Sequence, residues 1–162
     1  KLQAKKTIVM DMNEQRLAFV REKMGVPDTI LTQGDGAEIK QLEALTDGQL
    51  ADVVVDATGS NKSMAQALNY CAFKGRLVYV GITQAEISIP HAPALHRREL
   101  DILASRNALP GDFTRIIQLI EGGVIDTKPW ITHHAPFDGM IDVFESWTRP
   151  ETGVIKAVVE LD

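Results

Sequence analysis

Short runs of β-branched residues alternate with longer amphipathic runs along most of this 162-residue chain. The clearest short run is Asp52–Ala57, which has three consecutive valines at its centre. Asn13–Met24 is typical of the longer runs, because apolar residues recur there at helical spacing. Strands separated by helices form βαβ units, which build a mainly parallel sheet with helices on both faces. The alternation therefore predicts an α/β fold.

The same patterns predict the remaining elements. Further strands are expected at Thr7–Asp11, Thr29–Thr32, Arg76–Val80, Leu100–Ala104 and Val154–Leu161, with a short extended piece at Trp130–Thr132. Asp35 and Glu38 have capping-box spacing, which predicts a helix after them. A second helix is expected after a cap at Ser60 or Asn61, with Met64, Leu68 and Cys71 on one side. Two more helices are expected, one from a cap at Asp112 and one over about 138–147. Residues 82–94 contain two prolines and predict a loop. Because the strands are apolar rather than alternating, we expect them to be buried on both faces.

Composition and charge exclude several classes of protein. The chain has 17 Lys and Arg against 22 Asp and Glu, a net charge of −5, without the basic stripe expected of a nucleic-acid-binding domain. No apolar run approaches the roughly 20 residues that a transmembrane helix needs. A single cysteine excludes an internal disulfide and favours a reducing compartment, so we expect a cytoplasmic protein. Neither nucleic acid nor membrane is an expected partner.

The residues that follow the strands are the candidate functional residues. Ligands of open parallel sheets bind beyond the carboxyl ends of the strands. Asp11 ends the first strand, Thr58-Gly59 follows the third and Gly81 follows the fourth. An acidic residue at the end of a second Rossmann strand accepts hydrogen bonds from the adenosine ribose, although Asp11 could simply favour a helix N-terminus. A glycine lets a ligand approach the backbone, although each could equally be an ordinary tight turn.

The phosphate-binding loop of dinucleotide-binding folds, G-x-G-x-x-G, is absent from the sequence. Gly34-Asp35-Gly36 does not replace it, because Ala37 and Glu38 follow and the segment comes after the wrong strand. We expect these residues to form a turn and a helix cap.

Taken in order, several segments resemble the zinc-containing medium-chain alcohol dehydrogenases. The resemblance rests on I-V-M-D-M-N-E-Q-R-L (8–17), A-D-V-V-V-D-A-T-G (51–59), G-R-L-V-Y-V-G (75–81), R-E-L-D-I-L-A-S-R-N-A (98–108), I-T-H (131–133) and G-V-I-K-A-V-V (153–159). It covers essentially the whole chain. The S-R-N-A piece looks most like the branch that acts on polyols and sugar acids, such as galactonate or idonate dehydrogenases.

The resemblance implies that residues 1–162 are one partial dinucleotide-binding domain, a Rossmann-like, doubly wound parallel sheet. The family's zinc-bearing catalytic domain, the first strand and the glycine loop would all precede Lys1. The first strand is central in the order 3-2-1-4-5-6, so its absence would leave a gap in the sheet with unpaired strand edges. We therefore expect this chain to be a piece of a longer protein and to be inactive alone.

Family roles carry over to particular residues. Asp11 would bind the adenosine ribose and select NAD over NADP, with Met12 beside the adenine and Arg16 reaching the ribose. The remaining cofactor-binding positions would be Thr58 and Gly59 under the cofactor, Val80, Gly81 and Ile82 along the nicotinamide, Ser105 and Asn107 near the carboxamide, and Lys156 near the pyrophosphate. Lys156 could otherwise be a solvated lysine of a terminal strand.

The resemblance also implies the chemistry of the parent enzyme. Zinc would hold the substrate hydroxyl and lower its pKa, and the alkoxide would transfer a hydride to NAD⁺. The substrate would be an alcohol, polyol or sugar acid. The sequence predicts no metal site within the chain, because the four histidines have no partner at ligand spacing. No residue of the chain is expected to be catalytic. Family members commonly pair through the strand near 100–105, which predicts a homodimer or homotetramer, although this strand could instead be buried within one subunit.

Two other functions fit parts of the pattern. A methyltransferase with a nucleoside cofactor also carries an acidic residue after its second strand, but it would not reproduce residues 98–108 and 153–159. A non-catalytic nucleotide-sensing module would bind NAD without any zinc domain encoded upstream.

Overall fold

The computed structural model describes residues 4–161, which form two compact units. The first unit spans Lys5–Asn107, and the second is built from Ala108 onward. In both units every paired strand is parallel to its neighbour, which confirms the predicted α/β class.

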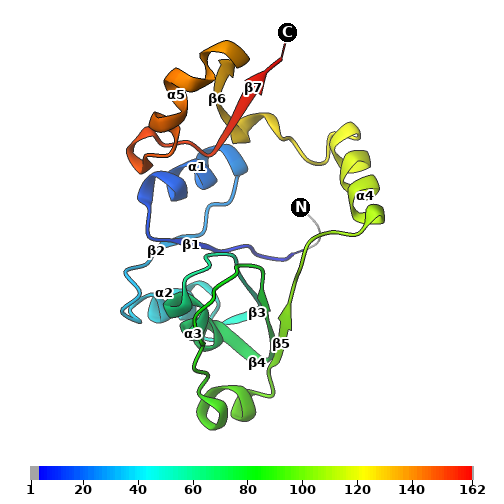
Figure 1. The fold of residues 1–162 in the computed structure, drawn as a ribbon. Helices are drawn as coiled ribbons and strands as arrows, with labels where there is room; N and C mark the ends of the chain where they lie inside the picture. Colours follow the sequence, from blue (N-terminus) through cyan, green and yellow to red (C-terminus); the bar gives the residue numbers. More distant parts are fainter. Residues whose placement is uncertain (1–3, 162) are drawn as a thin grey trace. The chain divides into compact units, whose positions relative to one another are not determined.

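The first unit alternates strands and helices along the chain (Figure 1). In order, its elements are β1 (Val9–Asp11), α1 (Glu14–Met24), β2 (Thr29–Leu31), α2 (Glu38–Leu45), β3 (Ala51–Asp56), α3 (Asn61–Gln66), a 3-10 helix (Ala67–Tyr70), β4 (Cys71–Tyr79), a π-helix (His91–His96) and β5 (Asp101–Ala104).

The two ends of helix α1 are set by the residues that predicted them in the sequence. The Asn13 side chain accepts hydrogen bonds from the backbone N–H groups of Gln15 and Arg16, which caps the first turn. Gly25 ends the helix with φ of 66°, a left-handed conformation that favours glycine. The predicted bounds of this helix are therefore confirmed.

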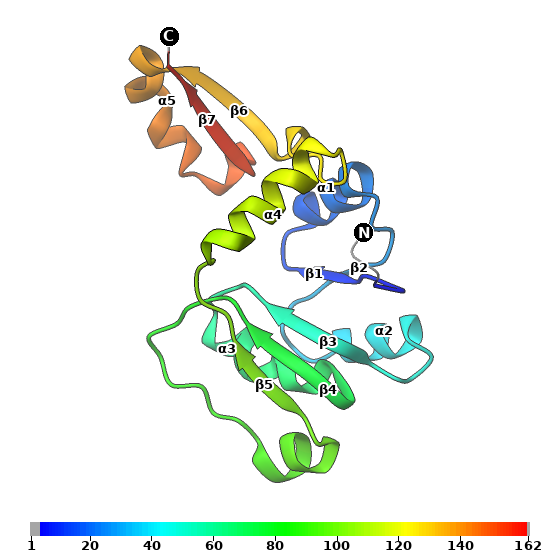
Figure 2. The same cartoon turned by 90° about the vertical axis from the view of Figure 1, so that its right-hand side faces the viewer.

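The strands of the first unit form two separate ladders, one of β1 and β2 and one in the order β3-β4-β5 (Figure 2). In the Rossmann order 3-2-1-4-5-6, β2 and β1 take the places of strands 3 and 2, and β3, β4 and β5 those of strands 4, 5 and 6. The break between the two ladders therefore falls where the first strand of the Rossmann order would lie. The sequence predicted a gap in the sheet at this place.

The core of the first unit lies on one face of the β3-β4-β5 ladder. Leu68 of the 3-10 helix, Leu77 of β4 and Ala94 of the π-helix are buried together. On the opposite face Val53 and Val55 are 53% and 59% exposed. The prediction that these strands are buried on both faces is therefore wrong for β3 within this unit, because the helices of the core cover only one side.

Strand β4 starts earlier than the sequence predicted. Cys71 is the first residue of β4 and pairs with Ala51. The prediction that Cys71 lies on a helix face was therefore wrong. The register then shifts, and Val53 pairs with Arg76. Gly75 lies inside this irregularity, where an added Cβ would be 2.8 Å from the Ala72 carbonyl oxygen. Gly75 therefore lies within β4, where its missing side chain permits a bulge, and not before the strand.

Three other local predictions were wrong. Helix α2 begins at Glu38 after Ala37, and the Glu38 carboxylate accepts from Gly36 N instead of completing a box with Asp35. Helix α4 (Pro110–Glu121) starts before Asp112, whose side chain accepts from the Leu109 backbone N–H. Part of the predicted loop is the π-helix at His91–His96. In each case side chain–backbone bonding or tertiary packing overrode local spacing.

The second unit contains the elements α4 (Pro110–Glu121), β6 (Ile131–Pro136), α5 (Met140–Trp147) and β7 (Lys156–Glu160), with short 3-10 helices at Lys128–Trp130, Phe137–Gly139 and Pro150–Thr152. Strands β6 and β7 pair, and α5 lies against β6 (Figure 2). The apolar side of α4 is exposed, and Phe113 is 61% and Ile117 53% accessible.

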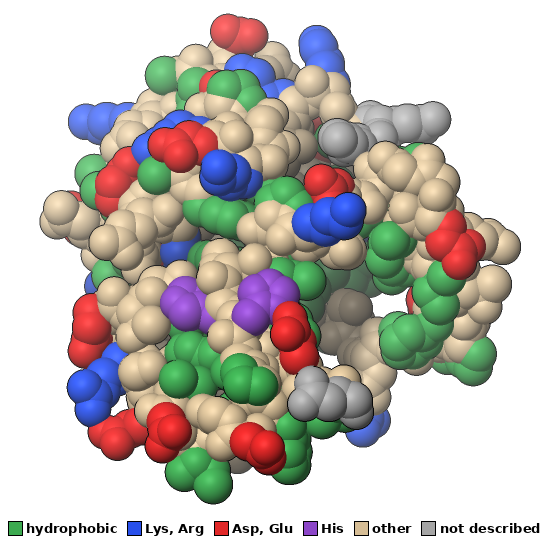
Figure 3. All heavy atoms as spheres, turned by 90° about the horizontal axis from the view of Figure 1, so that it is seen from above, with side chains coloured by type: hydrophobic (Ala, Val, Ile, Leu, Met, Phe, Trp, Pro, Cys, Tyr) green, Lys and Arg blue, Asp and Glu red, His purple; other side chains and the backbone are tan. Residues whose placement is uncertain are grey.

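Charged side chains of both signs are interspersed on the surface shown in Figure 3. No helix within residues 4–161 has both the length and the apolar character that crossing a membrane requires.

Candidate functional site

The carboxyl ends of β3 and β4 meet backbone to backbone through two glycines. A Cβ added to Gly81 would lie 2.4 Å from Gly59 N and 3.1 Å from Thr58 N. A Cβ added to Gly59, which has φ of +67°, would lie 3.1 Å from the Ile82 carbonyl oxygen. The structure thus brings together Thr58, Gly59, Gly81 and Ile82, four of the residues that the resemblance gave as cofactor-binding positions. The missing side chains of the two glycines let the turns after β3 and β4 pack backbone to backbone, closer than any other residue would allow.

Asp56, the last residue of β3, holds this junction together. Its backbone carbonyl accepts from Val80 N at 2.8 Å and Gly81 N at 3.0 Å. Its carboxylate accepts from both the N–H and the hydroxyl of Thr58, at 2.9 and 2.7 Å, and from the Ser63 hydroxyl at 2.7 Å. Asp56 is only 5% exposed. Asp56 is not among the site residues predicted from the sequence, although an acidic residue that ends an apolar strand just before Thr-Gly was a usable signal.

The segments after β4 and β5 extend the junction. Val80 and Ile82 flank Gly81 and are 45% and 86% exposed, so both offer apolar surface beside the glycine. Ser105 continues the β5 edge, because its N–H donates to the Tyr79 carbonyl at 2.8 Å. Asn107 has φ of 54°, a left-handed conformation that turns the chain after β5.

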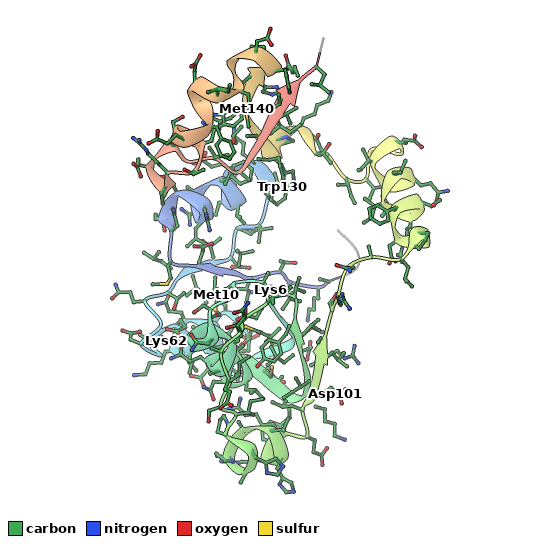
Figure 4. The ribbon with its side chains drawn as sticks, viewed as in Figure 1. Lys6, Met10, Lys62, Asp101, Trp130 and Met140 are labelled. Carbon is green, nitrogen blue, oxygen red and sulfur yellow. The ribbon has the colours of Figure 1, made fainter. Side chains whose placement is uncertain are left out.

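Asp11 ends β1, whose middle residue Met10 is labelled in Figure 4. One Asp11 carboxylate oxygen accepts from Asn13 N at 2.8 Å, and the other lies 3.8 Å from an Arg16 Nη1. The neighbouring Met12 is 72% exposed. The structure therefore places Asp11, Met12 and Arg16 together at one strand end, with an acidic group and an open apolar side chain side by side.

Lys156, the first residue of β7, belongs to the second unit. It lines a cavity of about 430 Å³ together with Thr127, Trp130, Ile131 and Val158. Trp130 is labelled in Figure 4. Lys156 is the one charged residue among those that line this cavity.

A second buried carboxylate supports the first unit away from these strand ends. Glu38 is 2% exposed, and its carboxylate accepts from the Tyr70 hydroxyl at 2.6 Å and from Gly36 N at 3.1 Å. Burial acts to raise the pKa of Glu38, but the hydrogen bonds from Tyr70 and the backbone outweigh it and lower that pKa below its ordinary value. Burial and the bond to Glu38 raise the pKa of Tyr70.

The described residues contain no group of three or more His, Cys, Asp or Glu side chains placed to hold a metal ion. His133 lies edge-on to Trp147, whereas the neighbouring His134 bonds to Glu160, so the two imidazoles have different surroundings. Burial raises the pKa of the Cys71 thiol to about 11, so this thiol is protonated and a poor nucleophile at neutral pH.

Two features define the class of this domain: parallel strands β3 and β4 whose ends meet through glycines, and an acidic residue, Asp11, that closes β1 in the other ladder. The first unit has the fold of a Rossmann-like cofactor domain. The chain belongs to the zinc-binding dehydrogenase family, whose model matches residues 1–122.

Curated relatives include the branch that the sequence suggested. The chain is 30% identical to L-galactonate-5-dehydrogenase of Escherichia coli over 94% of this chain and 44% of that protein. It is 32% identical to L-arabinitol 4-dehydrogenase of Hypocrea jecorina, over 94% and 41%, and 31% identical to L-idonate 5-dehydrogenase of Vitis vinifera, over 90% and 40%. The chain thus spans less than half the length of these relatives.

Solved structures share the fold. An Escherichia coli oxidoreductase/dehydrogenase of unknown specificity has a TM-score of 0.86 at 24% identity, covering 99% of this chain and 45% of that one. An alcohol dehydrogenase from Escherichia coli CFT073, determined with NADH, has a TM-score of 0.83 at 20% identity, covering 96% and 44%. The family match favours the dehydrogenase interpretation over the methyltransferase.

Proposed function

We propose that this chain is the NAD-binding half of a zinc-dependent alcohol, polyol or sugar-acid dehydrogenase. The observation that carries the proposal is the Gly59–Gly81 junction at adjacent strand ends, where an added Cβ on Gly81 would meet backbone at 2.4 Å. Ligands of doubly wound sheets bind at these strand ends, and the junction fixes the backbone of both ends at the place where a dinucleotide would lie.

The chain's residues bind and orient the cofactor. Asp11 accepts hydrogen bonds from the adenosine ribose and repels a 2′-phosphate, with Arg16 and Met12 beside it. Thr58 and Gly59 lie under the dinucleotide, Val80, Gly81 and Ile82 lie along the nicotinamide, and the backbone at Ser105 and Asn107 holds the carboxamide. Lys156 neutralises pyrophosphate charge. NAD⁺, when bound, supplies the hydride acceptor, and this half of the enzyme fixes where that acceptor lies.

The substrate proposal rests on the named relatives, which are galactonate, idonate and arabinitol dehydrogenases. The proposed substrate is a secondary alcohol of a polyol or sugar acid, whose carbinol carbon gives its hydride to NAD⁺ while the hydroxyl loses its proton. Zinc belongs to the proposal through the family, but residues 4–161 do not fit it, because they hold no cluster of metal-ligating side chains.

The protein is proposed to be cytoplasmic and to assemble as a homodimer or homotetramer through the edge of β5. Leu103 on that strand is 46% exposed, which leaves apolar surface beside the edge for a second subunit to cover.

Calorimetric titration of the protein as its gene encodes it, first with NAD⁺ and then with NADP⁺, tests the cofactor assignment. We expect NAD⁺ to bind more tightly. Turnover is then measured with galactonate, idonate and arabinitol, before and after zinc removal by a chelator. Absence of NAD⁺ binding would contradict the proposal, whereas NAD⁺ binding without any turnover would favour the nucleotide-sensing module.

A further inference from the structure

Asp56 uses nearly all of its polar atoms to shape the junction between β3 and β4. Five hydrogen-bond donors converge on it: two on its backbone carbonyl from Val80 and Gly81, and three on its carboxylate from Thr58 and Ser63. Buried hydrogen bonds to a charged group are among the strongest in proteins, and a fully satisfied network fixes one conformation. Asp56 therefore decides the shape of the turn that contains Thr58 and Gly59.

The same network fixes the direction of the Thr58 hydroxyl. A hydroxyl has one proton to donate and two lone pairs to accept with. The Thr58 hydroxyl donates its proton to Asp56 Oδ1 at 2.7 Å, and it accepts from the Ser60 backbone N–H at 3.1 Å. One lone pair is left for a ligand. Because the proton is already engaged, Thr58 can accept a hydrogen bond from a ligand but cannot donate one.

We propose that Asp56 is a positioning residue of the cofactor site. It holds the Thr58–Gly59 turn in the shape that receives the dinucleotide, and it makes Thr58 an acceptor that selects a donor group of the ligand, a ribose hydroxyl or a carboxamide N–H, over a phosphate oxygen. This inference rests on the proposed NAD-binding function. Asp56 itself is buried and acts through Thr58, as supporting residues do in preorganised sites.

The test is the dissociation constant for NAD⁺, measured by calorimetry on the protein as its gene encodes it, well below the melting temperature of each variant. Asp56→Ala removes the acceptor of Thr58 and should raise the dissociation constant at least about tenfold, the loss expected for one hydrogen bond to a charged group. Asp56→Asn keeps an oxygen for Thr58, while the Ser63 hydroxyl can rotate to accept from the amide. It should stay within about threefold of the unaltered protein, since both contacts survive.

Glu38→Ala is the matched control. Glu38 is 2% exposed against 5% for Asp56, and it likewise accepts hydrogen bonds from a hydroxyl and a backbone N–H. We expect this variant to melt at a lower temperature but to bind NAD⁺ with an unchanged dissociation constant. Should Asp56→Ala fail to fold, Thr58→Val replaces it, because this substitution removes the same hydroxyl from the network, and Thr58→Ser should preserve binding.

The outcomes separate the two proposals. If the unaltered protein does not bind NAD⁺, the proposed function is wrong and this inference falls with it. If the unaltered protein binds NAD⁺ but Asp56→Ala, or Thr58→Val in its place, stays within about twofold, only the positioning role is overturned. An equal loss in Glu38→Ala, or in Asp56→Asn, would also overturn it, since binding would then depend on general stability or on charge rather than on the Thr58 contact.

Discussion

Gly81→Ala should destabilise the junction between β3 and β4, and the loss of unfolding free energy should exceed what helix or strand propensity alone would cause. The added methyl carbon would lie 2.4 Å from Gly59 N and 3.0 Å from Gly59 Cα, whereas ordinary contact begins at 3.4 Å. Relief requires the two backbone segments to move apart by 3.4 − 2.4, about 1 Å. The atoms in the way belong to backbone that is hydrogen-bonded through Asp56, so no flexible side chain can yield.

The expected magnitude follows from that displacement. Overpacking of this kind costs about 1–3 kcal/mol of unfolding free energy. A misplacement of about 1 Å in a binding site can cost on the order of a hundredfold in function. We therefore expect Gly81→Ala to lower the melting temperature by several degrees, about 2–4 °C per kcal/mol, and to raise the dissociation constant for NAD⁺ at least about tenfold.

The assay pairs thermal unfolding with calorimetric titration of NAD⁺, and Gly111→Ala is the control. Nothing lies within 4 Å of a Cβ added to Gly111, which is in helix α4, so that substitution should be neutral or slightly stabilising. If Gly81→Ala matches this control in both melting temperature and NAD⁺ affinity, the contact between the two turns does not restrict the site, and the reasoning from the glycine junction is refuted.

Three further predictions concern other parts of the chain. Asp11→Ala should lower the preference for NAD over NADP by roughly tenfold or more, since it removes a charge-assisted bond; titration with both cofactors measures this, and unchanged selectivity would contradict the role of Asp11. Lys156→Ala should raise the dissociation constant for NAD⁺, and an unaltered constant would rule out the pyrophosphate contact. The hydrogen bonds of Glu38 lower its pKa below the ordinary 4.5, so the stability they provide is present above that pH and is lost as pH falls through the folded-state value. Tyr70→Phe should therefore reduce stability at pH 7 by about 1–3 kcal/mol and flatten the loss below about pH 4.5; denaturant titrations from pH 7 to 3 that show parallel curves would refute this.

Local chemistry determined the elements of this fold that the sequence predicted correctly. The bounds of α1 were readable because Asn13 caps the helix and Gly25 ends it, and both effects depend on residues within a turn of each other. The strand run around Val53–Val55 was readable because β-branched residues favour extended backbone. The order of strands and helices then fixed the α/β class and placed Thr58, Gly59 and Gly81 at strand ends.

Tertiary structure decided what depends on residues far apart in the chain. Cys71 begins a strand because it pairs with Ala51, and no local pattern reports such a partner. The burial of Asp56 and Glu38 follows from donors that the fold delivers, since a buried carboxylate persists only when its oxygens are hydrogen-bonded. The sequence alone thus determined which residues stand at the strand ends. Only folding determined that two of those ends meet through glycines and that one buried aspartate joins them.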